Sequence, residues 1–220
     1  MRGRFITFEG GEGSGKSTQT KLLAQRLKPF GMAVLLTREP GGSPGAEAIR
    51  HVLLSGAAKP LGAHAEAILF AAARDDHVSQ TIRPALDAGK WVISDRFADS
   101  TRIYQGSLGN VDQRLLARLE RITIGDTRPD LTIILDVPVE IGLARAAERG
   151  AGADRFEAEN IEFHEKLREA YLELAEREPQ RCVVIDGSAD PAEVGNAVWA
   201  IVHARLHPAQ AAMHLEDVAP

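Results

Sequence analysis

Short runs of apolar and β-branched residues recur along the chain, and helix-like sequence separates each run from the next. The runs cover residues 5–8, 33–36, 91–93, 131–135 and 182–185. Apolar runs of this kind are typical of strands that are buried on both faces of a sheet. The regular alternation of strand and helix therefore predicts an α/β protein in which helices cover both faces of a parallel sheet.

Seven segments have the spacing of helices: residues 16–27, 44–54, 65–87, 112–124, 139–149, 157–177 and 191–206. Three residues mark helix ends: Asp112 as an N-cap, Gly89 just after a C-terminus, and Pro191 in a first turn. The glycine-rich segments 41–45 and 150–154 are expected to be mobile inserts. Residues 1–206 are expected to form one domain, while residues 207–220 lack periodicity and are expected to be a flexible tail.

Charge and composition exclude several classes of protein. The 220 residues carry a formal net charge of −5, so no general basic face is available for nucleic acid. The chain has neither a signal-like segment nor an apolar run long enough to span a membrane, which predicts a soluble cytoplasmic protein without a membrane partner. Its one cysteine, Cys182, lies in an apolar run and is expected to be a buried core residue.

The segment between the first strand and the first helix fits the pattern G-x-x-x-x-G-K-[ST]. Its glycines allow backbone N–H groups to turn around phosphate oxygens at the positive end of the following helix. Lys16 is expected to reach the β- and γ-phosphates of ATP, and Ser17 to ligate Mg²⁺. The predicted ATP-binding residues here are Gly10, Gly11, Glu12, Gly13, Ser14, Gly15, Lys16, Ser17 and Thr18.

Other motifs narrow the class of nucleotide-binding protein. The chain lacks the N-K-x-D pattern of GTPases and the L-S-G-G-Q pattern of transporter ATPases, which favours a small-molecule phosphotransferase. The strand at 91–93 leads into Asp95 and Arg96. An acid at that strand end is placed to organise Mg²⁺ through water, and the adjacent arginine to hold a phosphate. Both are predicted to be catalytic, together with Lys16.

Several motifs occur in an order that resembles the thymidylate kinases. They are Phe8-Glu9-Gly10, the segment Thr37 to Gly42, the segment Leu69 to Arg74, Asp95-Arg96, Tyr104-Gln105-Gly106 and the strand at 131–137. The resemblance implies a three-layer P-loop fold of the nucleoside monophosphate kinases, with a central five-stranded parallel sheet. It also implies a homodimer that uses ATP and Mg²⁺ to convert dTMP to dTDP.

A set of acceptor-site residues follows from these motifs. Phe70 and Arg74 are spaced i, i+4 on one helix face and are able to converge on a single base. In the family, that phenylalanine stacks on thymine and that arginine meets its carbonyl. The resemblance also places Glu12 near the sugar 3′-hydroxyl and Tyr104 against the sugar, where it excludes a ribose 2′-hydroxyl. The further predicted dTMP-binding residues are Arg38, Arg50, Arg96, Ser100 and Gln105.

The position of a further catalytic arginine divides the thymidylate kinases into two branches. Arginine is absent from the variable P-loop positions here, while Arg145, Arg149 and Arg155 surround the glycine-rich segment 150–153. The chain therefore resembles the branch whose lid supplies the arginine, with a lid at about residues 145–156. We expect Arg149 to be catalytic, with Arg155 as the second candidate, and Arg145 and Arg155 to contact ATP.

Two alternatives remain open from the sequence. One is another nucleotide or deoxynucleoside kinase, such as a cytidylate kinase. The other is a P-loop ATPase that acts as a switch on a protein partner. A switch ATPase releases phosphate without a monophosphate acceptor, whereas a kinase produces two diphosphates, so an acceptor screen with ATP and Mg²⁺ separates them.

Overall fold

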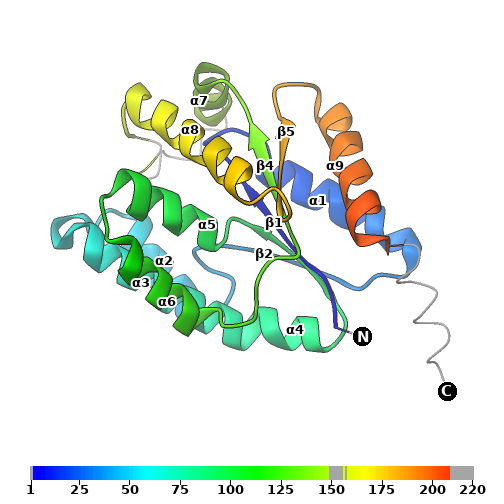
Figure 1. Ribbon diagram of the computed structural model, residues 1–220, viewed down its shortest axis with the longest axis horizontal. Helices are drawn as coiled ribbons and strands as arrows, with labels where there is room; N and C mark the ends of the chain where they lie inside the picture. The colour runs from blue at the N-terminus through cyan, green and yellow to red at the C-terminus, as the bar shows by residue number, and fades with distance from the viewer. Residues whose placement is uncertain (1, 149–155, 157, 209–220) are drawn as a thin grey trace.

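The computed structural model describes residues 2–148, 156 and 158–208, which contain a parallel five-stranded sheet between two layers of helices (Figure 1). The strand order is β2-β3-β1-β4-β5, as expected for a three-layer α/β fold. The strands are β1 (Phe5–Glu9), β2 (Val34–Arg38), β3 (Trp91–Asp95), β4 (Leu131–Asp136) and β5 (Cys182–Asp186). The α-helices are α1 (Lys16–Leu27), α2 (Pro44–Leu54), α3 (Gly62–His77), α4 (Arg83–Asp87), α5 (Ala98–Thr101), α6 (Gln113–Thr123), α7 (Val139–Glu148), α8 (Ile161–Arg177) and α9 (Pro191–Leu206). Shorter or wider helical turns are η1 (Lys28–Phe30), η2 (Lys59–Leu61), η3 (Val78–Ile82) and η4 (Arg102–Leu108).

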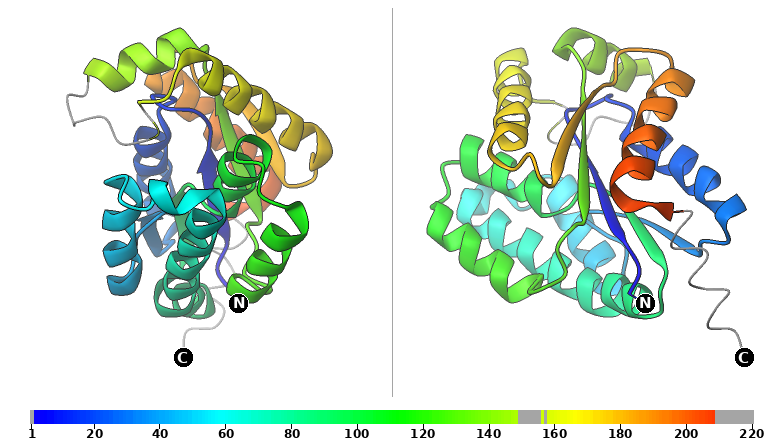
Figure 2. Two further views of the ribbon diagram at one scale, coloured as in Figure 1. Left: turned by 90° about the vertical axis from the view of Figure 1, so that its left-hand side faces the viewer. Right: turned by 45° about the vertical axis from the view of Figure 1, so that its right-hand side comes forward.

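Strand β1 lies at the centre of the sheet, and all of its residues are buried. Its alternate side chains divide the core in two, because successive residues of a strand point to opposite faces. Ile6 and Phe8 pack in the layer formed by α1 and α9, whereas Phe5 packs with Phe97 and the layer that contains α4. Both views in Figure 2 show α1 and α9 on one face of the sheet and α5 and α8 on the other.

The predicted strands and most predicted helices are confirmed. Helices α1, α2 and α9 have the predicted bounds, while the predicted helix at 65–87 consists of α3, η3 and α4 in succession. The Asp112 side chain accepts a hydrogen bond from the N–H of Arg114, and Gly89 has a φ of 77° after α4. Helix α8 begins at Ile161 rather than at 157, because Asn160 caps its N-terminus by accepting from the N–H of Phe163.

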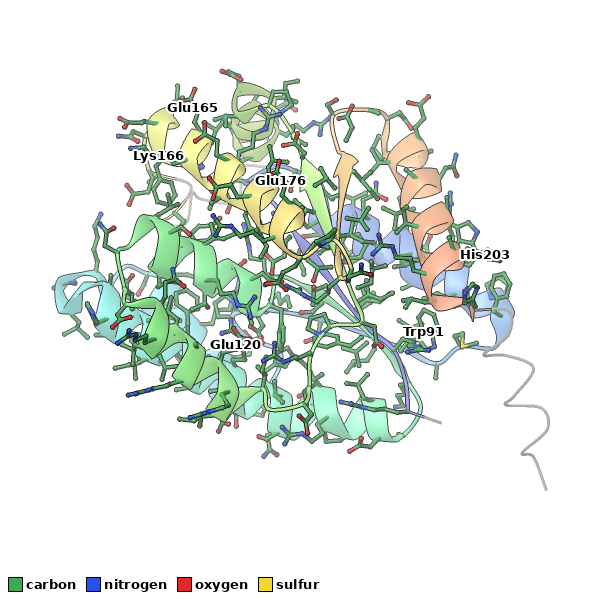
Figure 3. All side chains as sticks on the ribbon, in the orientation of Figure 1. Trp91, Glu120, Glu165, Lys166, Glu176 and His203 are labelled. Carbon is green, nitrogen blue, oxygen red and sulfur yellow. The ribbon has the colours of Figure 1, made fainter. Side chains whose placement is uncertain are left out.

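Solvent-facing charges on α8 show why its pattern was readable from the sequence. Glu165, Lys166 and Glu176 point outward, as Figure 3 shows, while Leu167 and Tyr171 are buried against the sheet. A helix with one apolar and one charged face has the periodicity that sequence analysis detects.

The sequence analysis missed the helical segment formed by α5 and η4. It has no single apolar face, since Asp99, Thr101, Gln105 and Gly106 are buried along with Ile103. The segment packs against α8, α3 and α6, so most of its surroundings are protein. Burial on several sides removes the periodic pattern on which the helix predictions rest.

The loop at 41–45, which the sequence predicted to be a mobile insert, makes several hydrogen bonds to neighbouring elements. The Gly42 N–H donates to Glu47 Oε1 (2.9 Å), and its carbonyl accepts from Thr81 Oγ1 (2.9 Å). Ser43 Oγ donates to Asp76 Oδ2 (2.6 Å). These bonds tie the loop to α2, α3 and η3. The other predicted insert, at 150–154, lies outside the described residues.

Within the described part of the chain, no helix is long and apolar enough to cross a membrane. Cys182 is buried as predicted, and burial raises the pKa of its thiol to about 12.

Candidate active site

A cavity of about 710 Å³ lies at the carboxyl ends of the strands, between the P-loop and the segments that follow β2, β3 and β5. Parallel strands bring their carboxyl ends to one edge of a sheet, which is where ligands of this fold class bind. Most predicted site residues reach its wall: Glu12, Gly13, Ser14, Gly15, Lys16, Ser17, Thr18, Arg38, Arg50, Phe70, Arg74, Asp95, Arg96, Ser100, Tyr104, Gln105 and Arg145. The first two P-loop residues, Gly10 and Gly11, line a separate small cavity instead.

The P-loop packs directly against the backbone of α7. A Cβ atom added to Gly13 would lie 1.9 Å from the carbonyl oxygen of Gly142, and one added to Gly142 would lie 2.5 Å from that of Glu12. Neither position therefore has room for a side chain. Gly13 also has a φ of 64°, in the left-handed region that favours glycine. This contact fixes the distance between the P-loop backbone and the first turn of α7.

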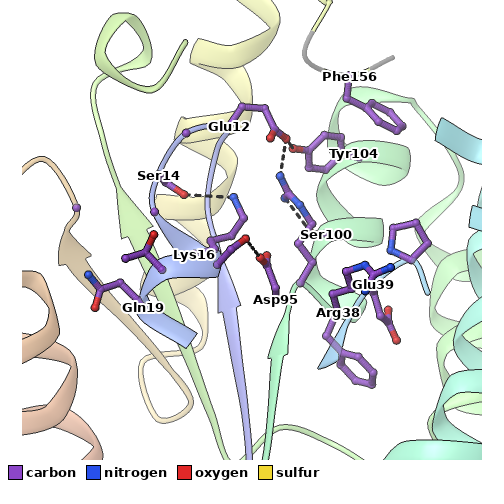
Figure 4. A pocket seen from close by; sticks show the side chains of 18 of the residues that line it. Glu12, Ser14, Lys16, Gln19, Arg38, Glu39, Asp95, Ser100, Tyr104 and Phe156 are labelled. Atoms are coloured by element: carbon purple, nitrogen blue, oxygen red, sulfur yellow. Dashed lines mark hydrogen bonds and ion pairs between the residues drawn. The ribbon is translucent and has the colours of Figure 1, made fainter. Parts of the chain in front are cut away.

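The Lys16 ammonium group is folded into the P-loop. Its Nζ donates to the carbonyl oxygens of Gly10 (3.1 Å) and Gly11 (2.6 Å) and to Ser14 Oγ (3.2 Å), and Figure 4 shows the bond to Ser14. Burial, followed by the positive charge of Arg96, lowers the pKa of Lys16 from 10.5 to about 8. Burial therefore outweighs the nearby carboxylates of Glu12, Asp95 and Glu9, and a bound polyphosphate would add negative charge beside this cation.

Ser17 and Asp95 bring two hard oxygen donors together at the floor of the cavity. Ser17 Oγ donates a hydrogen bond to Asp95 Oδ2, which joins the first turn of α1 to the end of β3 (Figure 4). No group of three or more His, Cys, Asp or Glu residues suited to a metal occurs in the described ranges. A hydroxyl and a carboxylate are hard oxygen donors of the kind that suits Mg²⁺, so Ser17 and Asp95 would be able to hold this ion.

Arg96 is the central cation on the opposite side of the cavity. Its guanidinium group pairs with Glu12 and donates to Ser100 Oγ (3.3 Å), and it lies against the ring of Tyr104. The Tyr104 hydroxyl group donates to Glu12 Oε1 (3.2 Å). The Glu12 carboxylate thus turns toward Arg96 and Tyr104.

The backbone of Arg96 has a φ of 69°, in the left-handed region that residues other than glycine rarely adopt. Two hydrogen bonds hold it there: its N–H donates to Phe8 O (2.9 Å), and Ser94 Oγ donates to its carbonyl (2.7 Å). Residues in this region are found where the surrounding structure imposes the conformation, often at functional sites.

Glu9 is a fully buried carboxyl group at the junction of three elements. It accepts hydrogen bonds from the N–H of Phe97 (2.8 Å), from Ser100 Oγ (2.7 Å) and from the Tyr171 hydroxyl group (2.9 Å). Glu9 therefore links the residue before the P-loop to α5 and to α8. Burial, assisted by the negative charge of Asp99, raises the pKa of Glu9 from 4.5 to about 7.

Replacement of Glu9 by Gln should change how stability depends on pH. A carboxyl group whose pKa is higher in the folded state binds more protons when folded, so its stabilising contribution is lost as the pH rises through that pKa. Between about pH 5.5 and about pH 8.5, the wild-type protein should lose about 2 kcal/mol of unfolding free energy relative to Glu9→Gln. Urea unfolding of both proteins at several pH values measures this difference.

Glu165→Gln provides the control, because it makes the same chemical change at an exposed residue of α8. A difference between wild type and Glu9→Gln that stays constant with pH would contradict the raised pKa of Glu9.

The far end of the cavity is apolar on one side and polar on the other. The rings of Phe70 and Phe156 are tilted by 46° with their centres 6.4 Å apart, and Tyr104 packs edge-on against Phe156 at 5.2 Å. Arg74 and Gln105 are buried and also line the cavity. The structure thus brings Phe70 and Arg74 to one end of the site, in the relation that their i, i+4 spacing predicts.

The two arginines near the loop after β2 have protein partners. Arg38 Nη2 donates to both carboxylate oxygens of Glu47 (3.0 and 3.1 Å), and this pair is exposed. Arg50 Nη1 donates to the carbonyl of Pro40 (2.6 Å). Both side chains reach the cavity wall, but Arg38 must share its charge with Glu47.

Sequence analysis missed the wall on the β5 side of the cavity, which consists of Gly187, Ala189, Pro191, Val194 and Gln19. Arg145 closes this wall by donating to the carbonyl oxygens of Gly187 and Ser188, at 2.8 Å each. The position of this segment directly after a parallel strand was the signal that could have identified it. Arg149 and Arg155, the two candidates for a catalytic lid arginine, lie outside the described residues.

Comparisons with known proteins agree with one another. The sequence model of the family described as thymidylate kinase matches residues 8–198. Proteins named thymidylate kinase from Nitrobacter winogradskyi and from Bradyrhizobium sp. (strain BTAi1) are 65% and 63% identical to this chain. Each alignment covers 96% of this chain, and 93% and 94% of the respective relative. The crystal structure of thymidylate kinase from Ehrlichia chaffeensis matches with a TM-score of 0.75 at 34% identity, over 92% of this chain and 100% of that chain.

Proposed function

The chain belongs to the thymidylate kinase family and transfers a phosphoryl group from ATP to dTMP, and we propose that the cavity described above holds both substrates during this transfer. The observation that carries the proposal is the division of one cavity into two ends. The P-loop and the β5 side form one end, and Phe70, Arg74 and Tyr104 form the other. Between these two ends lie cationic side chains and the pair of oxygen donors, Ser17 and Asp95, that suits a metal ion. Transfer between two phosphates requires groups of both kinds.

The donor end binds ATP through the P-loop. Its backbone N–H groups and Lys16 hold the phosphates, and the purine base lies between Arg145 and the segment 187–194. Ser17 and Asp95 hold Mg²⁺, with Asp95 acting partly through water. When bound, this ion neutralises charge on the β- and γ-phosphates. Lys16 then exchanges its three contacts within the loop for phosphate oxygens.

The acceptor end orients the phosphate of dTMP toward the donor. Arg96 and Arg38 approach this phosphate from opposite sides, with Arg50 as a third cation. A phosphate monoester is already an oxyanion near neutral pH, so the reaction requires no general base. Catalysis consists of positioning the two phosphates and neutralising the charge that redistributes between them.

The base and sugar of dTMP lie at the apolar end. Phe70 stacks on thymine, Arg74 and Gln105 meet its polar edge, and Ser100 adds a polar contact near Arg96. Glu12 accepts a hydrogen bond from the sugar 3′-hydroxyl. The Tyr104 ring fills the space that a ribose 2′-hydroxyl would occupy, and its contacts with Glu12 and Phe156 keep it there.

Tyr104→Ala should relax the preference for a deoxyribose. The ratio of kcat/KM for dTMP to kcat/KM for the ribose form of the same nucleotide should fall by about tenfold or more, since an unwanted hydroxyl in a filled site costs about 1–3 kcal/mol. Steady-state kinetics with both acceptors measures the ratio. Tyr104→Phe is the matched control, because it keeps the ring and should keep the ratio within about threefold. If Tyr104→Ala slows both acceptors equally, Tyr104 is a packing residue.

A lid arginine completes the donor side. The variable positions of the P-loop contain no arginine, and Arg145 already serves the β5 loop by bonding to two carbonyl groups. We assign to Arg149 the role of neutralising the negative charge on the transferred phosphoryl group, with Arg155 as the alternative. Single-turnover rates of Arg149→Ala and Arg155→Ala decide between the two.

We further propose that the enzyme is a cytoplasmic homodimer. A chain with one buried cysteine forms no internal disulfide, as is usual in a reducing compartment. Helix α2 packs on α3 and α3 on α6, and each of these helices exposes an apolar side chain. These side chains are Val52, Ile68 and Ile122, with Ile122 being 73% exposed. Sedimentation at several concentrations tests this assignment.

A further inference from the structure

Arg74 reaches the acceptor end of the cavity as a buried cation that is held on two sides. Its Nε donates to Glu39 Oε2 (2.8 Å), and its Nη2 donates to Thr101 Oγ1 (3.0 Å) and to the carbonyl of Phe97 (3.2 Å). Both Arg74 and Glu39 are about 4% exposed. Because the buried guanidinium is planar, fixing two of its nitrogens sets the direction in which the third points.

Glu39 is held in turn by a second buried side chain. Its other oxygen, Oε1, lies 3.1 Å from His77 Nδ1, and His77 Nε2 lies 2.6 Å from Thr37 Oγ1. A carboxylate accepts hydrogen bonds only, so the proton must be on Nδ1. The other ring nitrogen, Nε2, makes its hydrogen bond with the Thr37 hydroxyl group. The chain of contacts runs from Thr37 through His77 and Glu39 to Arg74.

The surroundings of His77 leave it little freedom. Its side chain is completely buried. A Cβ atom added to Gly42 would lie 2.4 Å from both His77 Nε2 and Thr37 Oγ1, so the loop after β2 closes over this contact. His77 is one turn beyond Arg74 on α3 but does not line the cavity. Any effect of His77 on the substrate must therefore pass through other residues.

We propose that His77 is a positioning residue for recognition of the acceptor base, acting through Glu39 on Arg74. It holds the Glu39 carboxylate in the plane that accepts from Arg74 Nε, and thereby aims the guanidinium group at the edge of the base. The inference rests on the proposed contact between Arg74 and thymine. According to this inference, a hydrogen-bond donor at the position of His77 Nδ1 determines how strongly and how selectively Arg74 contacts thymine.

Two substitutions of His77 separate the functions of its ring nitrogens. Asn places an amide donor near the position of Nδ1, whereas Gln places its amide near the position of Nε2 and leaves Glu39 Oε1 without its donor. His77→Gln should raise KM for dTMP by about tenfold, with kcat and KM for ATP changing by less than about twofold. His77→Asn should keep KM for dTMP within about threefold.

Base selectivity provides a readout that a loss of packing would not reproduce. Thymine presents a carbonyl oxygen where cytosine presents an amino group, so an aimed guanidinium donor favours dTMP over dCMP. His77→Gln should lower the ratio of kcat/KM for dTMP to that for dCMP by about tenfold, and His77→Asn should restore it. Thr37→Val, which removes only the hydroxyl partner of Nε2, should raise KM for dTMP by about threefold and provides a test if a His77 variant fails to fold.

The inference is overturned if His77→Gln has parental KM and selectivity, if Gln and Asn have equal effects, or if kcat and both KM values change together. If the His77 variants do not fold, a parental KM for dTMP in Thr37→Val overturns it. The variant Arg74→Met shows whether a negative result is due to the proposed contact between Arg74 and thymine or only to the role of His77. An unchanged KM for dTMP in that variant removes both proposals, whereas a raised KM with parental behaviour of His77→Gln removes only the role of His77.

Discussion

Lys16→Met is expected to lower the rate of phosphoryl transfer by about 10³-fold or more, while the dissociation constant for dTMP stays within about threefold. The side chain is almost fully buried, and its ammonium group lies among the carbonyl groups of the P-loop. Met keeps the volume of the aliphatic stem but removes the charge that the β- and γ-phosphates require in the transition state. The acceptor end, with Phe70 and Arg74, is untouched by the change.

Single-turnover kinetics and calorimetric titration with dTMP measure the two quantities. Lys21→Met is the matched control, since Lys21 is an exposed residue of the same helix and its replacement should leave both values unchanged. A Lys16→Met enzyme within tenfold of the parental rate would show that the donor phosphates are neutralised without this cation.

Gly142→Ala should lower kcat/KM for ATP by about 10²-fold, although the substitution is small and lies on a helix. The added methyl group would stand 2.5 Å from the carbonyl oxygen of Glu12, so the P-loop or α7 must shift by most of an ångström. A displacement of about 1 Å between reacting groups costs about 10²-fold in rate. Helix propensity acts in the opposite direction, because alanine favours a helix by about 1 kcal/mol over glycine.

The matched control for this substitution is Gly195→Ala on α9. Gly195 is also a buried helical glycine, but the nearest atom to its added Cβ would be Gln19 Oε1 at 3.3 Å, the end of a side chain that is able to move. This variant should keep kcat/KM for ATP within about threefold. Equal losses in the two variants would mean that the contact between the P-loop and α7 has no special role.

The sequence predicted the parts of the fold whose side chains repeat with a clear period. Apolar runs identified all five strands, and the helical spacing of Leu22, Leu23 and Leu27 identified α1, in which Leu23 and Leu27 are buried. Asp95 and Arg96 could be placed beside the P-loop because the ends of neighbouring parallel strands meet at one edge. Local pattern and strand topology were sufficient for these elements.

The remaining features depend on contacts between distant residues. Nothing in the local sequence of Glu9 shows that Tyr171, far along the chain, donates to it. The link between Glu39 and His77 likewise joins the residue after β2 to the end of α3. The helix that carries Tyr104 was missed because its buried side chains point in several directions. Arg145 was predicted to contact ATP as part of a lid, and its attachment to the loop after β5 became visible only in the folded chain.

The approach of Gly13 and Gly142 limits how the enzyme is able to evolve. In most packed contacts, a larger residue on one side is compensated by a smaller one on the other. Two contacting positions are then able to change together without loss of stability. Here each position already has the smallest residue, and each added atom would meet main chain rather than a side chain. No exchange at the partner position is able to restore space. Suppressors of a change at either glycine must therefore act by moving the P-loop or α7 as a whole.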